Sequence, residues 1–206
     1  MNRRIIPTVI GDEQAESVLE TTAEGNRTLG VLLPGIGYTC DRPLLYYTGR
    51  LLQEHGCDLL RVRYGSIPGD GSAINDVSAS VLETIREALS PSYIDIILVG
   101  KSYGTVVAGR LMSRLSRSCR VRMLLYTPVR ATLSYMNGSG YLAFSGTEDE
   151  YLTAGDVDRW FGDHDPRIIS YEGANHSLEI PGDTFATLDI LEDLLGRAEA
   201  FLFPRR

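Results

Sequence analysis

A serine lies at the centre of the motif G-x-S-x-G, which occupies residues 100–104 as Gly-Lys-Ser-Tyr-Gly. A strongly apolar stretch at 94–99 predicts a buried strand before it, and a segment of helical character follows at 105–117. A serine on such a sharp turn has a strained backbone, and its neighbours must be glycine because a Cβ would strike the adjacent strand and helix. The pattern predicts that Ser102 is a nucleophile, beside helical N–H groups that favour an oxyanion.

Two other interpretations of this motif are weaker. Gly100-Lys101-Ser102 resembles the end of a phosphate-binding loop, G-x-x-x-x-G-K-[ST], but the first glycine would fall at Asp95. The residues between form the core of the predicted strand and cannot also form a glycine-rich loop. A simple tight turn is the remaining alternative, and the strand-turn-helix context disfavours it.

A serine hydroxyl needs a base that takes its proton and an acid that orients the base. His55 ends a predicted helix, and His164 lies in an acidic loop whose spacing fits neither a calcium nor a zinc site, so we expect no metal. His176 follows a late predicted strand, where a loop residue can reach the carboxyl ends of the strands. His176 is therefore the candidate base, and a loop histidine without catalytic role is the alternative.

The candidate acid is Asp149, which follows another predicted strand in the sequence Gly-Thr-Glu-Asp. The chain order is then Ser102, Asp149, His176, and each gap is wide enough for complete strand and helix units. Glu148 and Glu150 are rival acids, and a plain surface carboxylate is a further alternative. The Gly-x-x-Asp register favours Asp149.

The elements that must position these residues form one predicted α/β domain over residues 1–206. Apolar runs bounded by Gly, Pro or charge alternate with helical segments, which is typical of a mostly parallel sheet covered by helices. The first two strands are weak and suit an antiparallel edge hairpin. The predicted strands lie at about 3–10, 16–22, 29–33, 57–62, 94–99, 121–126, 141–145 and 167–171, and the helices at about 43–54, 72–89, 105–117 and 184–203.

Charge and composition exclude several other classes of protein. The chain has 27 acidic and 20 basic residues, a net charge of −7, so a nucleic-acid partner is not expected. Apolar runs are too short to span a bilayer and no secretory signal is visible, so we expect a cytoplasmic protein. The three scattered cysteines suit reduced thiols.

Three motifs, Gly-x-Ser-x-Gly at 100–104, Gly-x-x-Asp at 146–149 and Gly-x-x-His at 173–176, occur in the order found in the α/β-hydrolase family. The chain resembles this family from the strand at 29–33 to the final helix. The resemblance implies the α/β-hydrolase fold, with a mostly parallel central sheet of about eight strands flanked by helices. It also implies an oxyanion hole formed by the backbone N–H groups of Tyr103 and Ile36, the latter in the loop at 33–38. This loop departs from the family pattern His-Gly-x-Gly because Pro34 replaces the histidine.

The predicted function is that of a cofactor-independent serine hydrolase that cleaves a small or medium carboxylic ester or thioester through an acyl-enzyme. Only residues 127–140 lie between two predicted strands where relatives often carry a lid, so no large cap fits. We expect an open, shallow site edged by Tyr38, Tyr103 and Pro128. A non-catalytic small-molecule-binding protein on the same scaffold is the alternative. The natural substrate, the choice among ester, thioester, lactone and amide, and the oligomeric state stay open.

Overall fold

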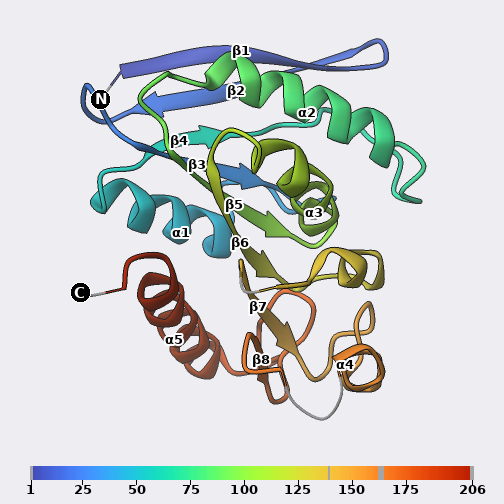
Figure 1. Ribbon diagram of the computed structural model, residues 1–206. Helices are drawn as coiled ribbons and strands as arrows, with labels where there is room; N and C mark the ends of the chain where they lie inside the picture. The colour runs from blue at the N-terminus through green and yellow to red at the C-terminus, as the bar shows by residue number, and fades with distance from the viewer. Residues whose placement is uncertain (1, 139, 162–164, 205–206) are drawn as a thin grey trace.

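An eight-stranded sheet forms the centre of the computed structural model, which describes residues 2–138, 140–161 and 165–204 (Figure 1). The strands lie in the order β1-β2-β4-β3-β5-β6-β7-β8. The β1–β2 and β2–β4 pairs are antiparallel, and the other neighbours are parallel. The strands are β1 (Asn2–Ile10), β2 (Glu13–Thr21), β3 (Thr28–Leu33), β4 (Asp58–Arg61), β5 (Asp95–Lys101), β6 (Arg120–Tyr126), β7 (Tyr141–Gly146) and β8 (Ile168–Tyr171). The predicted sheet, with its antiparallel N-terminal hairpin, is confirmed.

Helices cover both faces of this sheet. α2, α3 and the 3-10 helix η1 pack on one face, and α1 and α5 pack on the other (Figure 1). The helices are α1 (Pro43–Glu54), α2 (Ile74–Ala88), α3 (Tyr103–Leu115), η1 (Arg130–Tyr135), α4 (Ala154–Phe161) and α5 (Thr184–Leu202). All four helices that the sequence predicts are present within a few residues of the expected bounds.

The sequence pattern did not predict α4. This helix has eight residues, of which Val157 and Phe161 pack against the core, too few to reveal a helical period. Its start is fixed by a reciprocal cap, because the Thr153 hydroxyl accepts from the Asp156 N–H while the Asp156 carboxylate accepts from the Thr153 N–H. Local hydrogen bonds therefore define where α4 begins.

β5 is buried along its whole length, which explains its uninterrupted apolar sequence. Successive side chains point to opposite faces of a strand, so Ile96 and Leu98 pack under α2 and α3 while Ile97 and Val99 pack under α1 and α5. A strand held from both faces fixes the position of whatever follows its carboxyl end.

The connection between β6 and β7 carries η1 and no inserted cap. Cys40, Cys57 and Cys119 are free thiols, as expected. Within the described parts of the chain, none of the helices combines the length and the apolar character that crossing a bilayer requires.

Candidate active site

Ser102 lies on the sharp turn between β5 and α3. Its φ of +52° and ψ of −117° are unusual for a residue with a side chain and cost about 1–3 kcal/mol of backbone strain. The surrounding chain holds this conformation, because the Ser102 N–H donates to the Tyr126 carbonyl at 3.0 Å and the Thr105 N–H donates to the Ser102 carbonyl at 2.8 Å. The side chain is half-buried at the carboxyl end of the sheet.

The glycines on either side of Ser102 are required by close backbone contacts. A Cβ on Gly104 would lie 2.0 Å from the Leu33 carbonyl oxygen, and one on Gly100 would lie 2.6 Å from the Gly104 carbonyl oxygen. Glycine therefore lets the first turn of α3 press against the end of β3. The predicted steric reason for the motif is confirmed.

A continuous hydrogen-bond chain joins the three residues that the sequence singles out. The His176 Nε2 atom lies 2.8 Å from Ser102 Oγ, and His176 Nδ1 lies 2.7 Å from Asp149 Oδ2. A carboxylate only accepts hydrogen bonds, so Nδ1 carries the proton and Nε2 accepts from the serine hydroxyl. The Asp149 side chain is fully buried, whereas His176 keeps 22% exposure. The structure thus brings the three side chains together.

Both oxygens of the Asp149 carboxylate have partners. Oδ1 accepts from the Tyr151 N–H at 2.8 Å, so the carboxylate cannot rotate away from His176. The rivals Glu148 and Glu150 are exposed. Tyr151, which sequence reasoning missed, also places its ring 4.5 Å from the His176 ring. A short turn after β7 thus buries Asp149 against His176 and leaves Glu148 and Glu150 exposed.

Backbone hydrogen bonds tie the loop after β7 to the loop that carries His176. The Glu148 N–H donates to the Ala174 carbonyl at 3.0 Å, and the Gly173 N–H donates to the Thr147 hydroxyl at 2.8 Å. A Cβ on Gly146 would lie 2.0 Å from the same Ala174 carbonyl, so the two loops touch through their backbones. The position of Asp149 relative to His176 is therefore set by backbone packing.

The predicted oxyanion donors lie on two segments beside Ser102. Tyr103 is the first residue of α3, so its N–H has no acceptor inside the helix. Gly35 and Tyr38 exchange two backbone hydrogen bonds around Ile36 and Gly37, and Gly37 has a φ of +71°, as in a type II turn. These bonds leave the Ile36 N–H unused by the turn. A Cβ on Gly35 would lie 3.2 Å from Ser102 Cβ, so this turn lies against the serine.

A buried lysine lies beneath the turn. Lys101 is 2% exposed, and its Nζ lies 5.1 Å from the centre of the Tyr38 ring, a cation–π arrangement. Burial lowers the pKa of Lys101 to about 8, opposed by the negative charges of Asp149 and Glu179. Lys101 continues the alternation of Val99 on β5, so the strand period could have predicted its burial.

Tyr38 joins the turn to α1. Its hydroxyl accepts a hydrogen bond from the Leu44 N–H at 3.0 Å, and burial raises the pKa of Tyr38 to about 12. The ring therefore packs between the turn, Lys101 and the first turn of α1. This structural role accompanies the predicted position at the edge of the site.

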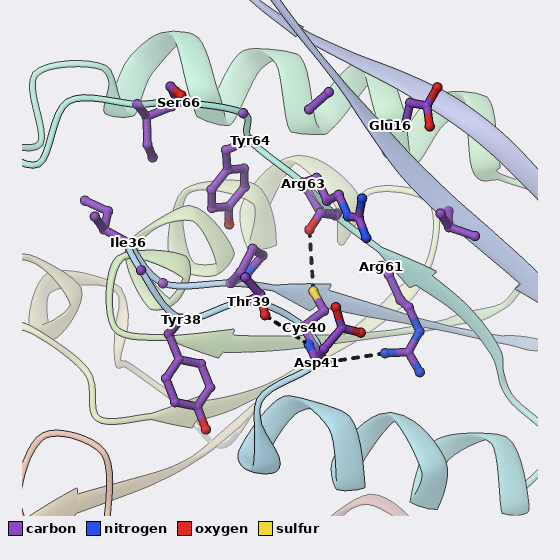
Figure 2. A pocket seen from close by; sticks show the side chains of 18 residues that line it. Glu16, Ile36, Tyr38, Thr39, Cys40, Asp41, Arg61, Arg63, Tyr64 and Ser66 are labelled. Carbon is purple, nitrogen blue, oxygen red and sulfur yellow. Dashed lines mark hydrogen bonds between the residues drawn. The ribbon is translucent and has the colours of Figure 1, made fainter.

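A cavity of about 700 Å³ lies beside the turn, and Ser102, Asp149 and His176 are not among its lining residues (Figure 2). Tyr38 lines it, whereas Tyr103 and Pro128, the other two predicted edge residues, are not among its lining residues. Pro128 is buried in the loop after β6. The walls come from β2, from the segment after β3 and from the segment after β4, and comprise Ala15, Glu16, Val18, residues 34–41 and residues 61–67.

His55 takes no part in this arrangement. His55 contacts Glu199 at 2.8 Å and stacks on Phe203, linking the ends of α1 and α5. His164 lies outside the described residues. In the described ranges, no group of three or more His, Cys, Asp or Glu side chains is arranged to hold a metal ion.

Comparison with solved structures identifies the architecture. A lidless α/β serine hydrolase from Xanthomonas campestris matches 100% of this chain and 97% of its own, with a TM-score of 0.69 and 14% identity. A Pyrococcus furiosus esterase aligns over 98% of this chain and 92% of its own, with a TM-score of 0.69 and 14% identity. An α/β serine hydrolase homologue from Coxiella burnetii aligns over 96% of this chain and 98% of its own, with a TM-score of 0.65 and 17% identity. No family model and no curated protein matches the sequence. The chain has the α/β-hydrolase fold without a large cap.

Proposed function

We propose that the protein is a serine hydrolase that cleaves a carboxylic ester or thioester through an acyl-enzyme. The observation that carries this proposal is the hydrogen-bond chain from Ser102 through His176 to the buried Asp149. The neighbouring structures named as serine hydrolases and as an esterase support the same class of reaction.

In the acylation step, Ser102 Oγ attacks the carbonyl carbon of the substrate while His176 Nε2 accepts its proton. Asp149 holds the Nδ1–H and stabilises the positive charge that forms on the imidazole. The imidazolium then donates its proton to the leaving alcohol or thiol, and the carbon–oxygen or carbon–sulfur bond breaks. The acyl group stays on Ser102 as an ester.

Hydrolysis of the acyl-enzyme uses the same groups. His176 takes a proton from water, the resulting hydroxide equivalent attacks the acyl carbon, and Ser102 leaves with the proton returned by the imidazolium. The N–H groups of Tyr103 and Ile36 stabilise the negative oxygen in both steps. One such donor is worth about 3–4 kcal/mol in a known protease.

Labelling with a fluorophosphonate probe tests this function directly, because the probe reacts with an activated serine. We expect the wild-type protein to be labelled at Ser102, as located by peptide mapping, and Ser102→Ala to be unlabelled. Ser134→Ala removes an exposed serine on η1 and should label like the wild type. A folded wild-type protein that is not labelled would instead support a non-catalytic binding protein on this scaffold.

A further inference from the structure

We propose that the cavity beside the turn at 35–38 is the acyl-binding subsite of the enzyme, and that it takes an uncharged, straight-chain acyl group of medium length. This inference rests on the proposed hydrolase function. It narrows the small or medium acyl group that the sequence predicts to one of medium length.

The cavity and the nucleophile share one wall. Gly35 lines the cavity and also lies against Ser102, since its Cβ would be 3.2 Å from that of the serine. Ile36 and Gly37 line the cavity as well, and Ile36 is the predicted oxyanion donor. Ser102 itself is not among the lining residues, so a carbonyl group held by this turn would lie at the edge of the cavity, with the acyl chain passing along the turn into it.

The direction of proton transfer decides which half of the substrate enters the cavity. His176 must donate its proton to the leaving group, so the leaving group lies on the His176 side of Ser102. In the sheet, β7 and β8, which precede Asp149 and His176, lie on one side of β5. The cavity is built from β2 and from the segments after β3 and β4, all on the other side of β5. The acyl group points away from the leaving group and hence toward the cavity.

The walls of the cavity suit a chain without net charge. Figure 2 shows Ile36, Tyr38 and Tyr64 toward one end of the view and the charged side chains toward the other. The apolar end belongs to the turn beside Ser102, so the first carbons of an acyl chain would contact apolar atoms. Two guanidinium groups and two carboxylates line the cavity, and their formal charges cancel; these are Arg61, Arg63, Glu16 and Asp41. An ionised chain end would therefore gain no net attraction.

The volume of the cavity exceeds what a short acyl group needs. Pockets of about 300–1,000 Å³ enclose most of the surface of a drug-sized ligand, and this cavity, at about 700 Å³, lies within that range. Each methylene group that leaves water contributes about fourfold in affinity. A hexanoyl group should thus be favoured over an acetyl group.

Two series of esters separate the acyl side from the alcohol side. The first varies the acyl group of 4-nitrophenyl esters from acetate through butyrate and hexanoate to octanoate, and the second varies the alcohol of acetate esters over the same lengths. For the wild type we expect kcat/KM for hexanoate to exceed that for acetate by about tenfold or more. Across the alcohol series, kcat/KM should change by less than about threefold. The 4-nitrophenyl monoester of adipate should be cleaved more slowly than the hexanoate ester.

A substitution that fills the cavity provides the decisive comparison. Ala15→Phe places a ring in the cavity from β2 and should reduce the hexanoate-to-acetate ratio of kcat/KM to about threefold or less, without changing the alcohol series. Gln14→Phe adds the same ring at the exposed neighbouring position and should keep the wild-type ratio. Because the readout is a ratio within one variant, partial loss of folded protein does not imitate the effect. Ala15→Leu serves if Ala15→Phe does not fold, which circular dichroism shows.

The outcomes are distinct for the two levels of the proposal. A wild-type protein that is labelled by fluorophosphonate and cleaves acetate, but shows no preference for hexanoate or an unchanged ratio in the Ala15 variant, overturns the acyl subsite alone. A preference that follows the alcohol series, or a faster reaction with the adipate ester, also overturns it. No labelling and no ester cleavage overturn the hydrolase function, and the acyl subsite with it.

Discussion

The two sides of Ser102 are built differently. On the side of β7 and β8, backbone meets backbone: the loops that carry Asp149 and His176 touch through Gly146 and the Ala174 carbonyl. On the side of β3 and β4, a cavity of about 700 Å³ lies next to the turn, and its lining includes the residues Ile36, Tyr64 and Arg61. The difference indicates that the positions of Asp149 and His176 are fixed by the chain path itself, whereas the proposed acyl subsite depends on side chains that can be exchanged without moving Ser102.

The largest effect is expected on the packed side, from Asp149→Asn. The amide cannot hold the Nδ1–H of His176 in the productive tautomer, so kcat should fall by about 10⁴-fold, as in a serine protease. The free energy of unfolding should change little, because asparagine has nearly the same shape as aspartate. Initial rates with a 4-nitrophenyl ester measure the loss.

Glu148→Gln is the matched control for this variant. Glu148 is the exposed neighbour of Asp149 and should retain the wild-type rate. If Asp149→Asn stayed within about twofold of wild type while Glu148→Gln lost activity, the acid would be Glu148.

The next largest loss of activity is expected from Ile36→Pro, in the turn at 35–38 that lies between the two sides of Ser102. Proline is favoured at the second position of a type II turn but has no N–H, so the turn persists while the proposed oxyanion donor is removed. We expect kcat to fall by about 10²–10³-fold. Ile36→Ala keeps the N–H and removes only the half-exposed side chain, so its kcat should stay close to that of the wild type. Equal losses in both variants would assign the effect to the side chain and not to the N–H.

The sequence predicts the side that carries Asp149 and His176 but not the cavity, because the two sides are formed by different kinds of interaction. Ser102, Asp149 and His176 each follow a strand, so chain order and strand ends suffice to bring them to one edge of the sheet. The cavity combines residues from β2 with segments after β3 and β4, and no local sequence pattern predicts the distance between these segments. The cation–π contact of Lys101 with Tyr38 could not be predicted either, because it also joins segments that are distant in the sequence.

Lys101→Met tests the charge buried beneath the turn. Burial holds the pKa of Lys101 at about 8, below its ordinary value of 10.5. Below pH 8 both folded and unfolded chains carry the proton, and the folded chain bears the full cost of the buried charge, up to about 3 kcal/mol. Between pH 8 and 10.5 the folded chain has released the proton while the unfolded chain still binds it, so the free energy of unfolding rises with pH from this group.

Methionine fits a similar volume without charge, so the variant should be more stable than the wild type at pH 7, by at most about 3 kcal/mol. The difference should shrink as pH approaches 10.5. Urea unfolding at pH 7 and pH 10 measures it, and titrations common to both proteins cancel. A Lys101→Met protein that is less stable at pH 7 would show that the contact with Tyr38 outweighs the cost of desolvation.

Gly104→Ala tests how rigid the packed side is. The added Cβ would lie 2.0 Å from the Leu33 carbonyl oxygen, and neither backbone can move without shifting α3 or β3. We expect the free energy of unfolding to fall by about 1–3 kcal/mol. Gly196→Ala is the matched control, because Gly196 lies inside α5 with open space around its missing Cβ and should gain about 0.5–1 kcal/mol. Urea unfolding measures the free energy of unfolding of each variant relative to wild type. The two changes should have opposite signs if packing around Ser102 is as rigid as its backbone contacts indicate. Two stabilised variants would mean that α3 can move away from β3 at little cost, and the contrast between the two sides of Ser102 would then be one of shape and not of rigidity.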